Sequence, residues 1–184
     1  RESAEKIGFV MQSPDSQTVC DKVSAELAFG LESFGVKSGE IQSRVGEMAA
    51  FFGIEPLYDR DISTLSGGQK QLVALCSVMA TDPDILLLDE PTAQLDPVAA
   101  RELLGILDRL NKEMGVTIII AEHDPEELFD SCDKILYLAK GKTEFFGTPA
   151  LTAKYFVENA LEGFLPETAK TFARLCDDLP LNVR

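Results

Sequence analysis

The sequence has few cysteines and no surplus of positive charge. Its four cysteines lie far apart and form no C-x-x-C pair, which argues against a zinc site or a disulfide framework and favours a reducing cytosol. The 31 acidic and 17 basic residues give a net charge of −14, which argues against binding to the phosphate backbone of a nucleic acid. No apolar run approaches the length of a membrane span, and no signal-peptide pattern is present. What remains is a chain of 184 residues, 45% hydrophobic, which suits one domain with a buried core.

Short apolar runs of strand length alternate with helical patterns. Buried strands are expected at 6–11, 84–91 and 116–123, and the Pro and Asp of 12–17 predict a loop after the first strand. Residues 134–147 have the pattern of two strands joined by a Lys-Gly turn. The order of the elements predicts an α/β fold with a mainly parallel sheet and right-handed crossovers.

Helical patterns fill the intervals between these strands. Residues 19–80 have a helical pattern that predicts a separate helical subdomain, and the tail, 148–184, is amphipathic at helical spacing. Further helices are expected to begin at Asp96 and Asp124, because each is a favoured N-cap residue followed by proline at the first helical position.

Polar side chains follow each of the three predicted parallel strands. Gln12 follows the first, Asp89 and Glu90 follow the second, and Glu122 and His123 follow the third. In open α/β sheets ligands bind beyond the carboxyl ends of the strands. In phosphoryl transfer one carboxylate can hold Mg²⁺ and a second can orient or deprotonate the attacking water, roles that suit Asp89 and Glu90.

The stretch "TLSGGQKQ" predicts a helix whose N-terminus suits an anion. Ser66 and Gln69 have the spacing of a capping box, and Gly67 and Gly68 leave the backbone open to a ligand. A helix N-terminus offers free N–H groups and a partial positive charge, which suit phosphate. An ordinary capped helix remains an equal alternative on these residues alone.

A complete nucleotide site of this kind also needs a phosphate cradle of the form G-x-x-x-x-G-K-[ST] after a strand. The nearest string is 30–38, "GLESFGVKS", but Val36 is inserted before Lys37 and a helical pattern precedes it. This string is therefore expected to be the end of a helix and a loop.

The ordered motifs together resemble those of ABC-type ATPases, over residues 7–149. "LSGGQ" stands about twenty residues before "ILLLDEP". After "ILLLDEP" come "LD" and then His123. The resemblance implies a P-loop NTPase fold with ATP and Mg²⁺ as ligands. It implies that Gln12 is the Q-loop glutamine and also a metal ligand, Asp89 the Walker B metal ligand, Glu90 the catalytic base, and His123 the switch histidine. The residues that correspond to the signature motif are Leu65, Ser66, Gly67, Gly68 and Gln69. Asp96 ends the D-loop, where Gln94 replaces the usual small residue.

The first half of the chain is similar to one group within that family. "VMQSPDSQTVCDKVSAELAFGLESFGV" and the ending "LPLNVR" resemble energy-coupling-factor and cobalt importers, although Ser13 replaces the usual Asn. This resemblance implies uptake of vitamins or transition-metal ions, and docking of the helical subdomain, 19–80, on a transmembrane coupling subunit. It places the protein peripherally on the cytoplasmic face of the membrane and implies no nucleic-acid partner.

ABC ATPases work in head-to-tail pairs, so the resemblance implies a second ATPase subunit, identical or different. The helix that begins after Ser66 would then contact the nucleotide held by that partner. These 184 residues are expected to be a single partial ATPase domain that lacks its own P-loop region and is inactive alone.

Two other functions are weighed against transport. A DNA-repair or chromosome-organising ABC ATPase usually has a long coiled coil between the Q-loop and the signature motif, whereas the interval from Gln12 to Leu65 is short. A partner-docking fragment without catalysis is the second alternative. The tail, 148–184, either packs on its own domain or contacts the second ATPase subunit, and the sequence leaves both open.

Overall fold

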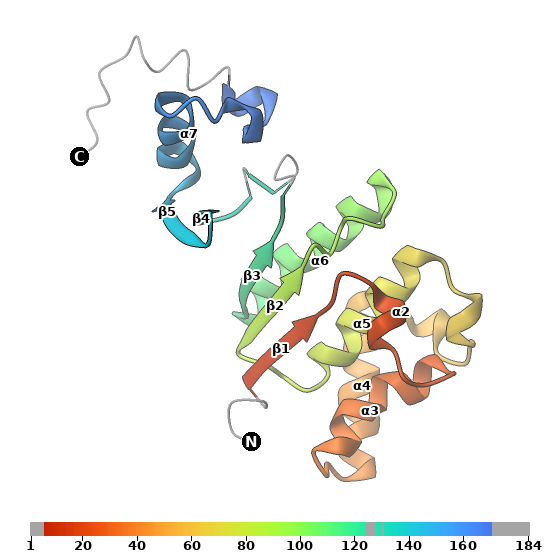
Figure 1. Cartoon of the computed structure of the whole chain (residues 1–184). Helices are drawn as coiled ribbons and strands as arrows, with labels where there is room; N and C mark the ends of the chain where they lie inside the picture. The colour runs from red at the N-terminus through yellow and green to blue at the C-terminus, as the bar shows by residue number, and fades with distance from the viewer. Residues whose placement is uncertain (1–5, 124–127, 130, 171–184) are drawn as a thin grey trace. The chain divides into compact units, whose positions relative to one another are not determined.

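The structure is a computed structural model that describes residues 6–123, 128–129 and 131–170 (Figure 1). The chain forms two compact units, Arg1–Ala121 and Glu122–Arg184. The helical subdomain at 19–80 lies within the first unit and the tail at 148–184 within the second. That the two regions are distinct functional domains remains a prediction.

The first unit is built on a three-stranded parallel sheet. Its strands are β1 (Ile7–Val10), β2 (Ile85–Asp89) and β3 (Thr117–Ala121), in the order β1-β2-β3. Near the carboxyl ends, Val10 lies opposite Leu88, which in turn lies opposite Ile120. The mixed α/β fold with a parallel sheet that the sequence predicts is confirmed, and the three strands end at one edge of the sheet.

Five helices of the first unit connect these strands. They are α2 (Pro14–Gln17), α3 (Val23–Ser33), α4 (Ser38–Phe52), α5 (Gly67–Met79) and α6 (Pro97–Met114). Short 3-10 turns, η1 (Glu55–Leu57) and η2 (Ile62–Thr64), lead from α4 to α5.

The expectation of a simple loop at 12–17 is wrong, because α2 makes one helical turn there. Proline at its first position has the φ of a helix and needs no N–H acceptor, so the residues that predict a turn also begin a helix. The string at 30–38 is a helix end, as expected. The helix α3 stops at Ser33, and Gly35 follows with a left-handed φ of +79°.

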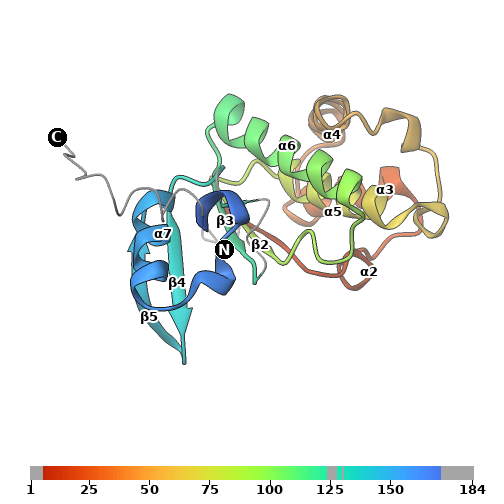
Figure 2. The ribbon, with the colours of Figure 1, turned by 90° about the horizontal axis from the view of Figure 1, so that it is seen from above.

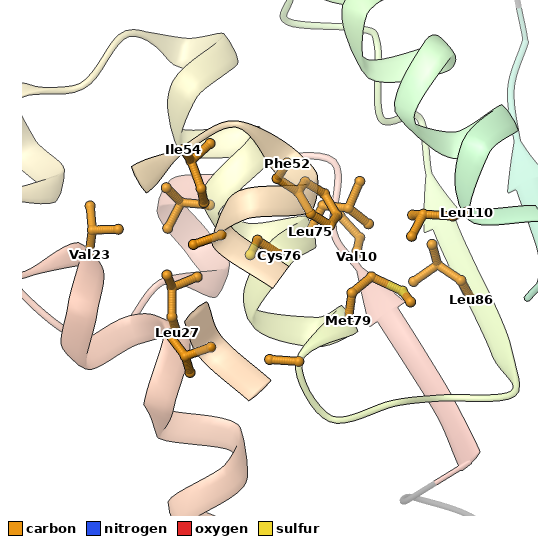
Figure 3. Close-up of a cluster of buried hydrophobic side chains, with 14 of the residues drawn as sticks. Val10, Val23, Leu27, Phe52, Ile54, Leu75, Cys76, Met79, Leu86 and Leu110 are labelled. Atoms are coloured by element: carbon orange, nitrogen blue, oxygen red, sulfur yellow. The ribbon is translucent and has the colours of Figure 1, made fainter. Parts of the chain in front are cut away.

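The hydrophobic core of the first unit lies between the sheet and its helices (Figure 3). Alternate residues of the strands, including Val10 and Leu86, point into it and contact the apolar faces of α5 and α6, including Met79 and Leu110. Both helices lie along the same side of the sheet (Figure 2). Ile7 and Phe9 point the other way and are 42% and 47% exposed among the described residues, so the opposite face of β1 contributes little to this core.

The second unit contains a hairpin and a helix. The strands β4 (Ile135–Ala139) and β5 (Lys142–Gly147) pair antiparallel, and the turn between them has left-handed φ angles at Lys140 and Gly141. This confirms the two strands and the Lys-Gly turn that the sequence predicts.

The helix α7 (Pro149–Glu158) lies against this hairpin in both views (Figures 1 and 2). Phe156 contacts Tyr137 edge-on at 4.9 Å between ring centroids, and Tyr155 stacks on Phe145 at 4.5 Å. The described part of the tail therefore packs on its own unit, and it continues through η3 (Glu162–Phe164). A contact with a second ATPase subunit remains a prediction.

Two expectations concern residues outside the described part. The helix expected to start in 124–132 has its first turn at 124–127, outside the described residues, and its described residues 128, 129 and 131 form turns instead; the end of the tail falls on 171–184. Within the described ranges, none of the helices combines the length and the apolar content that crossing a bilayer requires.

Candidate functional site

The carboxyl edge of the parallel sheet brings two predicted site residues into contact. Gln12 follows β1 by two residues, and Glu90 directly follows β2. The side-chain amide of Gln12 donates a hydrogen bond from Nε2 to Oε2 of Glu90 at 2.5 Å. Because β1 and β2 are parallel neighbours in register, their carboxyl ends place these side chains next to one another.

The backbone of Glu90 has a left-handed conformation. Its φ is +43°, which is uncommon for a residue with a side chain. Its N–H donates to the carbonyl oxygen of Ala121 at 2.9 Å, and its own carbonyl accepts from Ala93 at 3.2 Å. These two bonds hold the strained residue in place, and such strain is common at functional sites.

Asp89 is the last residue of β2 and lies opposite Ala121 in the sheet register. Its side chain is exposed at the sheet edge. Among the described residues, no three His, Cys, Asp or Glu side chains gather into a ready-made metal site. One exposed carboxylate fits Mg²⁺, which is usually held by one or two carboxylates together with water and substrate phosphates.

The N-terminus of α5 has the capping box that the sequence predicts. The backbone N–H of Ser66 donates to Oε1 of Gln69 at 3.0 Å, and the backbone N–H of Gln69 donates to Oγ of Ser66 at 3.3 Å. Ser66 and Gly67 are exposed, and the first N–H groups of a helix have no acceptor within the helix. The first turn therefore presents backbone donors at the surface, an arrangement that fits a phosphate group.

The two remaining residues of the motif have structural reasons for their identity. A Cβ on Gly68 would lie 3.0 Å from Cβ of Ala99, so glycine allows α5 to approach α6 closely. The side chain of Leu65 is 7% exposed and belongs to the hydrophobic core. Any contact of Leu65 with a bound group would therefore come from its backbone.

Asp96 caps α6, as the sequence predicts. Its Oδ1 accepts hydrogen bonds from the backbone N–H groups of Val98 at 2.9 Å and Ala99 at 3.1 Å. The bond from Ala99, followed by that from Val98, lowers the pKa of this carboxyl. Since Ala99 also contacts Gly68, the capped ends of α5 and α6 are neighbours.

A pocket of about 250 Å³ joins the segment after β1, the first turns of α5 and the loop before α6. It is lined by Gln12, Pro14, Asp15, Gly67, Lys70, Gln71, Pro91, Gln94 and Leu95. The structure therefore brings Gln12 and the glycine-rich end of α5 to one pocket within the first unit.

His123 lies two residues beyond the end of β3 and is exposed. It belongs to the second unit, whereas Gln12, Asp89 and Glu90 belong to the first. Its convergence with these three residues therefore remains a prediction.

Sequence reasoning missed three side chains around this site. Lys70 forms an ion pair with Asp15 at 2.6 Å across 55 residues of sequence, and no local pattern signals such a long-range pair. Gln17 folds back on β1, with its Oε1 accepting from the N–H of Met11 and its Nε2 donating to the carbonyl of Phe9. Gln71 is 1% exposed and lines the pocket, and its position on the apolar face of α5 was a signal that it is buried.

Comparison with known proteins adds independent evidence. The family described as "ABC transporter" matches residues 1–93. An ABC transporter ATP-binding protein of Bacillus thuringiensis subsp. konkukian is 42% identical over 184 residues, which are 99% of this chain and 33% of that protein. An energy-coupling factor transporter ATP-binding protein of Symbiobacterium thermophilum is 40% identical over 145 residues, which are 79% of this chain and 50% of that protein.

A solved structure resembles most of this chain. It is cbiO1 from Clostridium perfringens, described as part of the ABC transporter complex cbiONQ, with a TM-score of 0.76 and 36% identity. The likeness covers 91% of this chain and 67% of that chain. The chain spans only a third of the length of the Bacillus relative, which is therefore a considerably longer protein.

Proposed function

The chain belongs to the ABC transporter ATP-binding family, and from this premise we propose that its first unit carries part of a shared ATP site in an importer ATPase. The observation that carries the proposal is the hydrogen bond from Gln12 to Glu90, at the carboxyl edge where β1 and β2 end. The family match alone does not require these two side chains to meet.

In the proposed site Glu90 is the general base. The attacking water gives a proton to the Glu90 carboxylate as its oxygen bonds to the γ-phosphorus of ATP. The bond from that phosphorus to the β–γ bridging oxygen breaks, and ADP leaves. Gln12, through its amide, fixes the orientation of the carboxylate that receives the proton. The proposal gives His123 the role of contacting the γ-phosphate.

Asp89 is the proposed magnesium ligand, with the side chain of Gln12 as a second oxygen donor. A Mg²⁺ ion held there would neutralise charge on the phosphate oxygens during transfer. Support comes from the exposure of the Asp89 carboxylate at the same sheet edge as Glu90.

The capped end of α5 is proposed to serve the nucleotide of a second ATPase subunit. Exposed Ser66 and Gly67 place helix N-terminal donors at the surface, where an outside phosphate could reach them. Gly68 and Gln69 complete this turn, and Asp96 holds the neighbouring end of α6 beside it. Each nucleotide would then lie between two subunits.

The proposed cargo is a vitamin or a transition-metal ion, delivered through a transmembrane coupling subunit at the cytoplasmic face of the membrane. Two relatives support this proposal: the energy-coupling factor protein of Symbiobacterium and cbiO1, which is part of a transporter complex. The region 19–80, which contains α3 and α4, is the proposed docking subdomain.

The decisive experiment uses the full-length protein that carries these residues. Glu90→Gln keeps the size of the side chain and removes the base, so ATP hydrolysis should fall by about 10²-fold or more while ATP still binds and holds the subunits together. Glu102→Gln on the exposed side of α6 is the matched control and should hydrolyse ATP at the normal rate. Near-normal turnover of Glu90→Gln would exclude Glu90 as the base.

A second experiment concerns the 184 residues by themselves. They contain no G-x-x-x-x-G-K-[ST] string, so we expect no heat of binding on titration with MgATP and no hydrolysis. Micromolar affinity for MgATP in this titration would contradict the proposal.

A further inference from the structure

The ion pair between Asp15 and Lys70 connects two parts of the candidate site. Asp15 lies on α2, three residues after Gln12, and Lys70 lies in the first turn of α5, four residues after Ser66. Their charged atoms, Oδ1 and Nζ, are 2.6 Å apart. Of the two side chains, Lys70 is 20% exposed and Asp15 is 69% exposed, so the lysine stem is largely packed while the carboxylate reaches it from the surface.

The segment that carries Gln12, residues 9–17, is held together by hydrogen bonds of the Gln17 side chain. Gln17 accepts a hydrogen bond from the N–H of Met11 at 2.8 Å and donates to the carbonyl oxygen of Phe9 at 3.2 Å. These bonds attach the end of α2 to the end of β1, so residues between them move together. A force on Asp15 therefore acts on Gln12 as well.

The first turn of α5 is equally well defined. The backbone N–H of Lys70 donates to the carbonyl oxygen of Ser66 at 2.9 Å, which is the first hydrogen bond of this helix. The capping box fixes Ser66 in turn. Lys70 is therefore attached directly to the helix end that is proposed to meet a phosphate.

The pocket of about 250 Å³ lies between the segment that carries Gln12 and the first turn of α5, and it is lined in part by Gln12, Gly67 and Gln71. Pro14 of α2 is buried, and the pocket beside it is not filled by side chains. Asp15 and Lys70 both line it, and their ion pair connects α2 with α5 beside it.

We infer that Asp15 and Lys70 form a positioning pair, which fixes the distance between the Gln12 segment and the first turn of α5 and thereby orients the Gln12 amide toward Glu90. The inference rests on the proposed function for its consequence in catalysis. Neither residue contacts the reacting atoms, and both act through Gln12. Loss of the pair should therefore lower kcat for ATP hydrolysis and leave the KM for ATP nearly unchanged.

The test is a double-mutant cycle in the full-length protein assembled with its partners. Lys70→Met keeps the apolar stem without the charge, and Asp15→Asn keeps the shape of the side chain. Each single variant should lower kcat by about fivefold or more, the scale on which contacting residues couple, with KM changed by less than about twofold. The double variant should be no slower than the slower single variant, because both changes remove the same contact.

The control is Lys112→Met on α6, which breaks the exposed ion pair of Lys112 with Asp108 at 2.9 Å. It should leave kcat and KM unchanged. A purely structural role of the Asp15–Lys70 pair would have little effect on turnover, because half-exposed ion pairs contribute little to folding. If the single variants keep normal kcat, or if their effects multiply in the double variant, the inference is overturned.

Hydrogen exchange gives a readout that does not depend on hydrolysis. In Lys70→Met, the backbone amide of Met11 should exchange at least about threefold faster than in the wild type. The reason is that the segment carrying Gln12 loses its ion-pair contact with α5. Unchanged exchange would overturn the inference even if turnover falls. ATP hydrolysis by the wild type and by Glu90→Gln tests the proposed function separately. If the wild type does not hydrolyse ATP, the proposed function fails. The exchange experiment still decides whether the Asp15–Lys70 ion pair holds the Gln12 segment.

Discussion

Gln12 and Glu90, separated by 78 positions in the sequence, share a hydrogen bond of 2.5 Å from the amide Nε2 to the carboxylate Oε2. The bond joins two neighbouring strand ends, and neither residue has a local reason to approach the other. The bond restricts the rotation of both side chains.

The variant Gln12→Met tests the consequence of this bond. Methionine has nearly the same length but no donor, so the Glu90 carboxylate loses its orientation, and kcat for ATP hydrolysis should fall by about tenfold or more. Because Gln12 is exposed, the free energy of unfolding should change by less than about 0.5 kcal/mol. Steady-state kinetics and urea unfolding of the full-length protein measure both quantities.

The control for this prediction is Gln42→Met on α4, which also replaces an exposed glutamine but lies in a different element. It should change neither quantity. Normal turnover of Gln12→Met would mean that the bond to Glu90 does not orient the base.

A second prediction concerns the contact of β1 with α5. A Cβ on Gly8 would lie 2.4 Å from Cγ1 of Val78, and the branched valine side chain cannot easily move away. Gly8→Ala should therefore lower the free energy of unfolding by about 1–3 kcal/mol. Gly46→Ala on α4, where a Cβ meets nothing within 4 Å, should instead raise it by about 0.5–1 kcal/mol.

Adding Val78→Ala to Gly8→Ala should recover part of the lost stability, because it removes the atom in conflict. Chemical denaturation of the wild type and the three variants measures the effect. A tolerated Gly8→Ala, with stability equal to the wild type, would show that β1 and α5 are farther apart than the structure has them.

The third prediction is a dependence of stability on pH at the start of α6. Hydrogen bonds from the backbone of Ala99, and then of Val98, lower the pKa of Asp96 below its ordinary value near 3.8. The ionised cap therefore stabilises the folded state at pH values above the ordinary pKa. This stabilisation is lost as the pH falls through the lowered pKa of the folded state.

Asp96→Asn retains a capping oxygen that does not titrate, which makes it the matched comparison. The stability advantage of the wild type over Asp96→Asn should shrink as the pH is lowered from about 7 to about 2.5, as measured by urea unfolding. A difference that stays constant over this range would mean that the cap does not favour the charged carboxylate.

Gln71 is the subject of the fourth prediction. Its side chain is 1% exposed, and within the described part of the chain its Nε2 has no hydrogen-bond partner. A buried donor without a partner costs about 1–3 kcal/mol. Gln71→Met, which fills the same volume, should therefore leave the free energy of unfolding unchanged or raise it by about 1 kcal/mol.

Gln71→Glu introduces a charge at the same place and should destabilise the protein by several kcal/mol, roughly the penalty for burying an unpaired charge. A loss of more than about 1 kcal/mol in Gln71→Met would indicate that an ordered water in the pocket accepts from this amide.

The sequence predicted the elements whose signals are local. The capping box of Ser66 and Gln69, the Asp96 cap and the Lys-Gly turn each depend on a few adjacent residues, and all three are confirmed. The parallel sheet followed from the alternation of strands and helices, and it also explains why Gln12 and Glu90 meet.

Contacts between distant segments could not be predicted in the same way. The partner of Lys70 is set by where α2 lies, and α2 itself was expected to be a loop because its proline and aspartate fit both a turn and a helix start. Gly68 was interpreted as an opening for a ligand, whereas its closest neighbour in the structure is Ala99 of α6. The assignment of Leu65 to the ligand site did not foresee that its side chain belongs to the core.

The positive φ of Glu90 sets a conflict between folding and chemistry at one position. A left-handed backbone costs a residue with a side chain about 1–2 kcal/mol, and only glycine would remove this cost. Glycine would also delete the carboxylate. Selection for stability therefore favours glycine at position 90, whereas selection for turnover favours glutamate. A screen for thermal stability alone should enrich inactive glycine variants at this position.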